Sequence, residues 1–137
     1  MIERYNHKME KKTLKNNVEK QITGEWLYFC PSEVTVRNLY EIFKETENVE
    51  IWEDAGVLEI PMGEKSSFDI ETAQIHPKDE ITKQFASEQQ AKTVFLVTFM
   101  PEDYEKAEVI MKQIAEQFGG VFCGDTEDFM PQIHGTL

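Results

Sequence analysis

Two stretches of this chain share one local pattern at positions 70 residues apart, and that pattern limits the folds that the chain can adopt. The first reads Tyr28-Phe29-Cys30-Pro31-Ser32-Glu33, and the second reads Thr98-Phe99-Met100-Pro101-Glu102-Asp103. Proline and carboxylates suit the first turn of a helix, because proline has no amide hydrogen to lose there and negative charge complements the helix dipole. Each half is therefore predicted to fold as strand, helix and short strand. The alternative is that any strand-to-helix junction favours these residues, since only Phe and Pro are identical in the two stretches.

The predicted strands are short and rich in aromatic and β-branched residues. They cover residues 25–30, 49–53, 57–62, 67–75, 93–99 and 121–123. The first and fifth are apolar on both alternating faces, which is typical of strands that are buried on two sides. The fourth alternates, with Phe68 and Ile70 on one face and Asp69 and Glu71 on the other, so its outer face is predicted to be solvated and negative.

The predicted helices follow from apolar residues at intervals of three and four. A helix after Pro31 is expected to be capped by Ser32 and to carry Val36, Leu39, Tyr40 and Phe43 on its apolar face. A helix over residues 102–118 ends at Gly119-Gly120. A shorter polar helix over residues 78–90 is expected to be anchored by Ile81 and Phe85.

A chain of 137 residues is long enough for one domain with its own core, so residues 1–137 are predicted to form a single α+β domain. Two βαβ halves joined by a hairpin-rich middle predict a ferredoxin-like antiparallel sheet with helices on one face, elaborated by extra strands and an N-terminal helix. Within the domain we expect a basic amphipathic helix over residues 1–22, a core over residues 25–123 and an irregular acidic tail over residues 124–137.

The chain is acidic, and its charge is unevenly distributed. It holds 26 Asp and Glu against 14 Lys and Arg, a formal net charge of −12, although residues 1–20 are net basic. An acidic surface repels phosphate backbones and anionic lipids and attracts cationic proteins. We therefore expect a basic protein as partner, and neither nucleic acid nor a membrane. The alternative is that the negative charge only keeps the protein soluble and does not contact a partner.

The spacings that indicate a catalytic or cofactor site do not occur in the sequence. Gly119-Gly120 follows a helix rather than opening one, so it does not resemble a phosphate-binding loop. The histidines at positions 7, 76 and 134 are too scattered for a zinc ligand pair. Cys30 and Cys123 are expected at opposite ends of neighbouring strands, which predicts no disulfide. We expect a protein that is not an enzyme, uses no cofactor and contains no catalytic or metal site.

The tail has a second interpretation, because Asp125, Glu127 and Asp128 place three carboxylates within four residues. Mg²⁺ binds to few carboxylates, whereas a Ca²⁺ loop spreads its ligands over about a dozen residues, a pattern that is absent here. An enzyme that uses these carboxylates with a divalent cation is the least favoured hypothesis. A solvated loop, with Phe129 and Met130 packed inward, or a partner contact is preferred.

The favoured hypothesis is a non-enzymatic acidic module that binds a basic partner. An exposed tryptophan among carboxylates is a reasonable interface anchor, and Trp52 is expected to point away from Val49 and Ile51. The predicted partner-binding residues are Glu50, Trp52, Glu53, Asp54, Asp69, Glu71, Asp125, Glu127 and Asp128.

In size, charge and α+β class the chain is similar to small acidic immunity proteins that neutralise basic nuclease toxins, and this resemblance implies an immunity or inhibitor function. The alternative is a small-molecule-binding or regulatory ferredoxin-like domain with a pocket between sheet and helices. Two cysteines and an N-terminus without the apolar core of a secretory signal predict a cytoplasmic protein.

Overall fold

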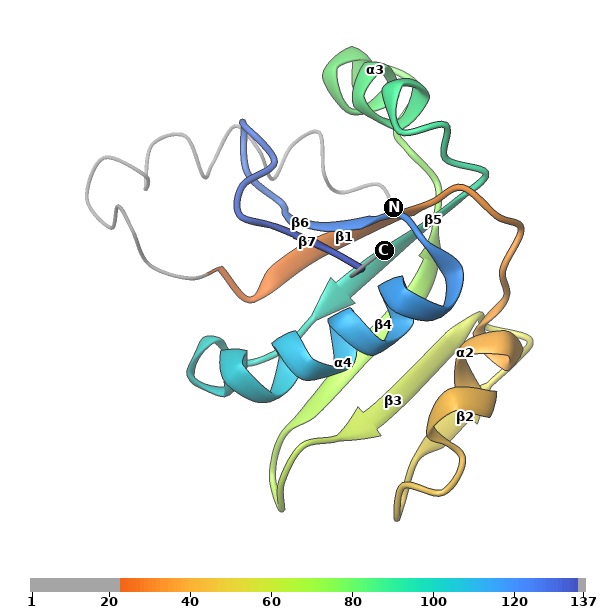
Figure 1. The fold of residues 1–137 in the computed structure, drawn as a ribbon, viewed down its shortest axis with the longest axis vertical. Helices are drawn as coiled ribbons and strands as arrows, with labels where there is room; N and C mark the ends of the chain where they lie inside the picture. Colours follow the sequence, from red (N-terminus) through yellow and green to blue (C-terminus); the bar gives the residue numbers. More distant parts are fainter. Residues whose placement is uncertain (1–22, 136–137) are drawn as a thin grey trace.

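A computed structural model describes residues 23–135 of the chain, which form a mixed α+β fold (Figure 1). Within these residues, three α-helices accompany a seven-stranded antiparallel sheet, so the predicted α+β class is confirmed. The elements follow one another as β1 (Glu25–Cys30), α2 (Val36–Phe43), β2 (Glu50–Trp52), β3 (Val57–Pro61), β4 (Ser67–Ala73), α3 (Glu80–Glu88), β5 (Thr93–Thr98), the 3-10 helix η1 (Pro101–Asp103), α4 (Tyr104–Phe118), β6 (Val121–Gly124) and β7 (Gln132–His134). The helix predicted over residues 1–22 lies outside the described residues.

The strands lie in the order β2-β3-β4-β5-β1-β6-β7, and every neighbouring pair is antiparallel. β1 and β5, the two strands predicted to be buried on both faces, pair along their full length inside the sheet. Side chains of both strands belong to apolar clusters on the two faces of the sheet, which suits their apolar sequences. The strand order is more elaborate than the ferredoxin-like plan that the sequence predicts.

The helices lie on both faces of the sheet, which corrects the prediction that they share one face. α2 and α4 cover one face (Figure 1), where Leu39 and Met111 pack with Tyr28 in the larger apolar cluster. α3 packs on the opposite face through Phe85, whose ring lies 5.1 Å from that of Phe29. Because β1 is apolar on both faces, it forms part of two cores and not one.

α2 begins later than predicted, because the segment before it is held by β5. The hydroxyl of Thr93 donates a hydrogen bond to the Ser32 carbonyl at 2.8 Å, so Ser32 belongs to the connection and does not cap the helix. Thr35 is the N-cap and forms a capping box with Asn38. Such a box satisfies two backbone amides that the helix start would otherwise leave without a partner.

α3 also differs from its prediction. Asp79 caps it by accepting a hydrogen bond from the Thr82 amide at 3.0 Å. Ile81, predicted as an anchor, is 58% exposed, whereas Thr82 is buried. The side of this helix that faces the sheet carries Thr82, Phe85 and Ala86, and Ile81 lies outside it.

The tail is not irregular throughout, because residues 132–134 form β7 against β6. Phe122 lies opposite Ile133 in this pair, and Ile133 is buried. A segment with a single apolar residue carries no strand signal of its own. The turn between β6 and β7 folds the segment back and makes it a strand.

Candidate partner-binding site

The sheet face opposite α2 and α4 carries carboxylates on three neighbouring strands. Glu50 of β2 lies opposite Glu59 of β3, and Glu59 lies opposite Asp69 of β4. Directly opposed residues of antiparallel strands project from the same face with Cβ atoms about 5 Å apart. Glu50, Glu59 and Asp69 therefore form one continuous line, here named the carboxylate row. Asp69 in turn lies opposite Thr98 of β5.

A second line of residues runs beside the carboxylate row, and it contains the candidate anchor. Trp52 lies opposite Val57, Val57 opposite Glu71, and Glu71 opposite Leu96. Trp52 is 46% exposed, whereas its neighbour Ile51 packs against the larger core. The predicted outward orientation of Trp52 is thus confirmed. This part of the face combines an exposed aromatic side chain with four carboxylates.

The carboxylate row is electrostatically unfavourable for the isolated protein. Burial raises the pKa of Glu59, and the carboxylates of Asp69 and Glu50 raise it further. The Ser67 hydroxyl donates to Asp69 at 2.7 Å, which adds a hydrogen bond but no positive charge. Among residues 23–135, no ion pair involves a member of the row. Like charges that face each other across strands destabilise a sheet, so the row lowers stability at neutral pH.

Removing one of these charges is expected to stabilise the fold. We expect Glu59→Gln to raise the free energy of unfolding by about 0.5 kcal/mol at pH 7. Because the pKa of Glu59 is raised on folding, its cost is present above the folded-state pKa and disappears at acid pH, where the group is protonated in both states. Urea unfolding across this pH range measures the effect. Glu64→Gln, in the exposed β3–β4 turn, is the control, and an equal gain there would contradict the explanation.

Glu53 and Asp54 follow β2 in an exposed turn, and Glu53 is already paired. The Arg37 guanidinium of α2 donates to both Glu53 carboxylate oxygens at 3.0 Å, and this contact lowers the pKa of Glu53. Arg37 also lies 3.9 Å from Glu41. Glu53 therefore faces the α2 side of the molecule, and a cationic partner would have to compete with Arg37 for it.

The three tail carboxylates are separate from the carboxylate row, because β6 and β7 lie at the other end of the sheet from β2. Asp125 is only 3% exposed and Glu127 is half-buried. Asp128 is exposed, and its carboxylate accepts hydrogen bonds from the Thr126 hydroxyl at 2.9 Å and from the Met130 amide at 3.2 Å. The structure thus separates the three predicted tail residues from those predicted on β2, β4 and the β2–β3 turn.

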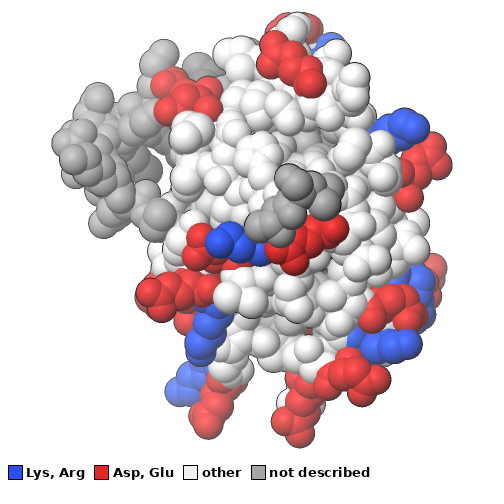
Figure 2. Space-filling model, viewed as in Figure 1, with Lys and Arg blue, Asp and Glu red and all other residues white. Residues whose placement is uncertain are grey.

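The helical face has a different charge pattern from the open sheet face. Figure 2 shows that carboxylates are dispersed over this side, both near its centre and at its margins, and that several have Lys or Arg beside them. Lys44 contacts Glu41 at 2.9 Å and Lys112 contacts Glu108 at 3.8 Å. Mixed charges of this kind suit a solvated surface. The carboxylate row, which has no such cations among residues 23–135, is the better candidate for a binding surface.

The described residues contain no cluster of three or more His, Cys, Asp or Glu side chains that could hold a metal ion. Cys30 and Cys123 are both buried and form no disulfide with each other, and they belong to the clusters on opposite faces of the sheet. In the same part of the chain, no helix has the length and apolarity that a membrane span requires.

Glu59 is the site residue that the sequence-based set omits. Its position between the buried Leu58 and Ile60 is a signal of an outward-facing strand residue. The local pattern does not predict that Glu59 lies opposite Glu50 and Asp69, because these pairings depend on the registers of the β2–β3 and β3–β4 hairpins.

Comparison of the chain with protein-family models, curated proteins and solved structures finds no match.

Proposed function

We propose that this protein is a non-enzymatic binding module that engages a basic protein partner through the open face of β2, β3 and β4. The observation that carries the proposal is the carboxylate row, Glu50, Glu59 and Asp69, in which like charges face each other without a cation among the described residues. Lysine or arginine side chains of a partner would relieve this repulsion on binding. The negative field would also steer a cationic protein toward the face and raise its association rate.

Trp52 gives this face an apolar contact beside the charges. Large aromatic side chains that become buried at the centre of an interface contribute a large share of binding energy. Trp52 is 46% exposed and lies opposite Val57, so a partner could cover both. Glu71 follows Val57 in the same line and would pair with a cation at the margin of that contact.

The proposal includes an immunity or inhibitor role, since an acidic binding face suits the neutralisation of a basic protein. It also includes a cytoplasmic location, which the low cysteine content, two in 137 residues, supports. A ferredoxin-like core is part of the proposal as well. The antiparallel order of the inner strands β4-β5-β1-β6, with α2 and α4 packed on one face, supports this assignment.

The test separates the carboxylate row from net charge alone. The double variant Glu59→Gln/Asp69→Asn removes two charges from the row, and Glu102→Gln/Glu105→Gln removes two exposed charges from the η1–α4 region. Full-length protein is immobilised, basic proteins are captured from host extract, and the affinity of a captured protein is measured at several salt concentrations. We expect the row variant to bind about tenfold more weakly and the control to bind nearly as the natural protein does.

Binding should also weaken steeply with salt, because ions screen charges over about 10 Å at 0.1 M ionic strength. Equal losses in both double variants would mean that only net charge matters and would refute a specific row. An interaction that is independent of salt would refute the electrostatic mechanism.

A further inference from the structure

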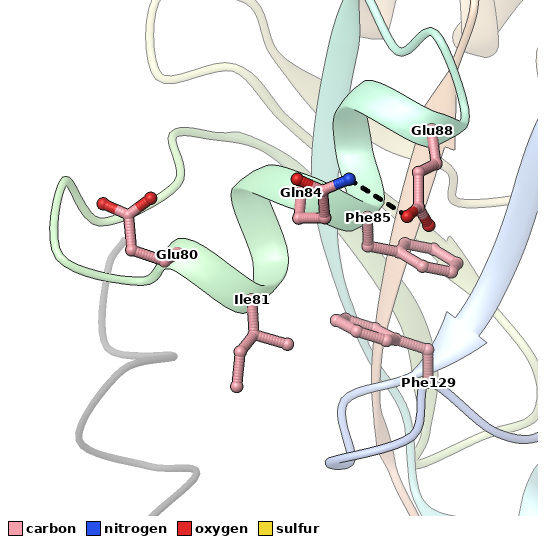
Figure 3. A pocket seen from close by; sticks show the side chains of 6 residues that line it. All are labelled: Glu80, Ile81, Gln84, Phe85, Glu88 and Phe129. Carbon is pink, nitrogen blue, oxygen red and sulfur yellow. Dashed lines mark hydrogen bonds between the residues drawn. The ribbon is translucent and has the colours of Figure 1, made fainter.

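A groove with an apolar floor lies on the sheet face that carries α3, between that helix and the β6–β7 loop (Figure 3). Its volume is about 340 Å³. Phe85 of α3 and Phe129 of the loop stack across it, with ring centroids 4.2 Å apart and planes at 10°. Ile81 lines the groove one turn before Phe85 and is 58% exposed. A large aliphatic side chain this exposed beside an aromatic pair is a surface that a further apolar segment could cover.

The remaining groove residues are polar, and two of them are acidic. Glu80 and Glu88 stand at either end of the α3 side, and Gln84 lies between them and donates to Glu88 at 3.1 Å. Figure 3 shows Glu80 and Glu88 at opposite ends of the helix. An occupant of this groove should therefore carry apolar residues along one side and positive charge beside them.

Residues 1–22 of the chain have this composition. Their basic residues outnumber their acidic ones, in contrast to the rest of the sequence. Their apolar residues occur at loosely helical intervals, as Tyr5, Met9, Val18 and Ile22. A segment with this pattern can present an apolar stripe flanked by lysines.

The described chain also begins near the groove. Thr23 lies beside Gly124, because a Cβ on Gly124 would be 3.3 Å from the Thr23 methyl group and would meet the Met130 carbonyl oxygen. Met130 directly follows Phe129, so the 22 preceding residues join the molecule at the base of the loop that forms one wall of the groove. Twenty-two residues in helical conformation span about 33 Å.

We propose that residues 1–22 dock in cis into the groove between α3 and the β6–β7 loop. The apolar side of the segment covers Ile81 and the accessible part of Phe85, and its lysines lie near Glu80 and Glu88. This intramolecular contact is independent of the partner-binding function proposed for the carboxylate row, and it would add a covering element to the α3 side of the sheet.

Hydrogen exchange on the full-length protein tests the proposal, with Ile81→Lys as the disrupting variant and Val109→Lys as its control. Val109 is 59% exposed and lies on α4, on the other face of the sheet. A lysine at position 81 removes apolar surface and repels a basic segment. We expect amides within residues 1–22 to exchange at least about tenfold more slowly than unprotected amides in the natural protein and in the control, and to lose this protection in Ile81→Lys.

Two further measurements keep the result unambiguous. Val18→Lys changes the segment and leaves the groove intact, so it should cause the same loss even if Ile81→Lys perturbs α3. Carbodiimide cross-linking should join lysines of the segment to Glu80 or Glu88 within one chain. Unprotected amides in the natural protein, protection that survives both lysine variants, or cross-links found only between isotopically distinct chains would each overturn docking in cis.

Discussion

Replacing Phe122 by alanine is expected to lower the free energy of unfolding by about 3–5 kcal/mol. Phe122 is fully buried on the α2–α4 face of the sheet, where its ring lies parallel to that of Tyr28 at a centroid distance of 4.0 Å. The two residues are also direct cross-strand partners in β1 and β6. The alanine variant therefore loses both the buried Phe122 ring and its stacking contact with Tyr28. The surrounding side chains are closely packed and cannot move to fill the cavity that remains.

Urea unfolding followed by circular dichroism measures this effect. Met100→Ala is the control, since Met100 is a large apolar side chain that is 50% exposed, and we expect it to change stability by less than about 0.5 kcal/mol. Phe122→Leu should fall between the two, because leucine keeps most of the buried volume. Similar losses for Phe122→Ala and Met100→Ala would show that the Tyr28–Phe122 stack contributes little.

Gly120→Ala is expected to destabilise the protein by about 3 kcal/mol, through backbone conformation and steric overlap together. Gly120 has φ +84°, a region that residues with a Cβ rarely adopt. A Cβ at this position would overlap the Phe29 carbonyl oxygen and would lie 3.0 Å from Cδ of Pro31. The neighbouring backbone is held in place, because the Tyr28 hydroxyl donates to the Gly119 carbonyl at 2.6 Å. The end of α4 thus has little freedom to move away.

Gly63→Ala is the matched control for this variant. Gly63 is exposed in the β3–β4 turn, and an added Cβ would approach nothing closer than the Ser66 hydroxyl at 3.7 Å. We expect Gly63→Ala to change the free energy of unfolding by no more than about 1 kcal/mol in either direction. If the two alanine variants unfold at the same urea concentration, the close approach of α4's end to β1 is not rigid.

The two Phe-x-Pro stretches illustrate where sequence reasoning succeeds and where it stops. Each does end a strand and precede a helix, but only in the second do the proline and the carboxylates lie in the first turn, as Pro101, Glu102 and Asp103 of η1. The start of α2 differs from its prediction, since the Thr93 hydroxyl binds the Ser32 carbonyl from a strand 61 positions away. A contact between residues so far apart in the chain cannot be predicted from the residues around Ser32.

The candidate site likewise has one feature that the sequence predicted and one that it did not. The outward position of Trp52 follows from alternation with Ile51, and the structure agrees. The burial of Asp125 in the tail does not follow from any local pattern, because it depends on β6 lying beside β1. The Asp125 amide donates to the Glu25 carbonyl at 2.9 Å, across that pair of neighbouring chain segments.

By itself the sequence determined the kinds of elements and the acidic outer face of β4, because residue periodicity and capping preferences operate over short stretches of chain. Only the tertiary structure decided which strands are neighbours, on which face α3 lies and that residues 132–134 pair as β7. The carboxylate row depends on those decisions: Glu50, Glu59 and Asp69 come from three strands, and a shift of one residue in either hairpin would turn one of them toward the core.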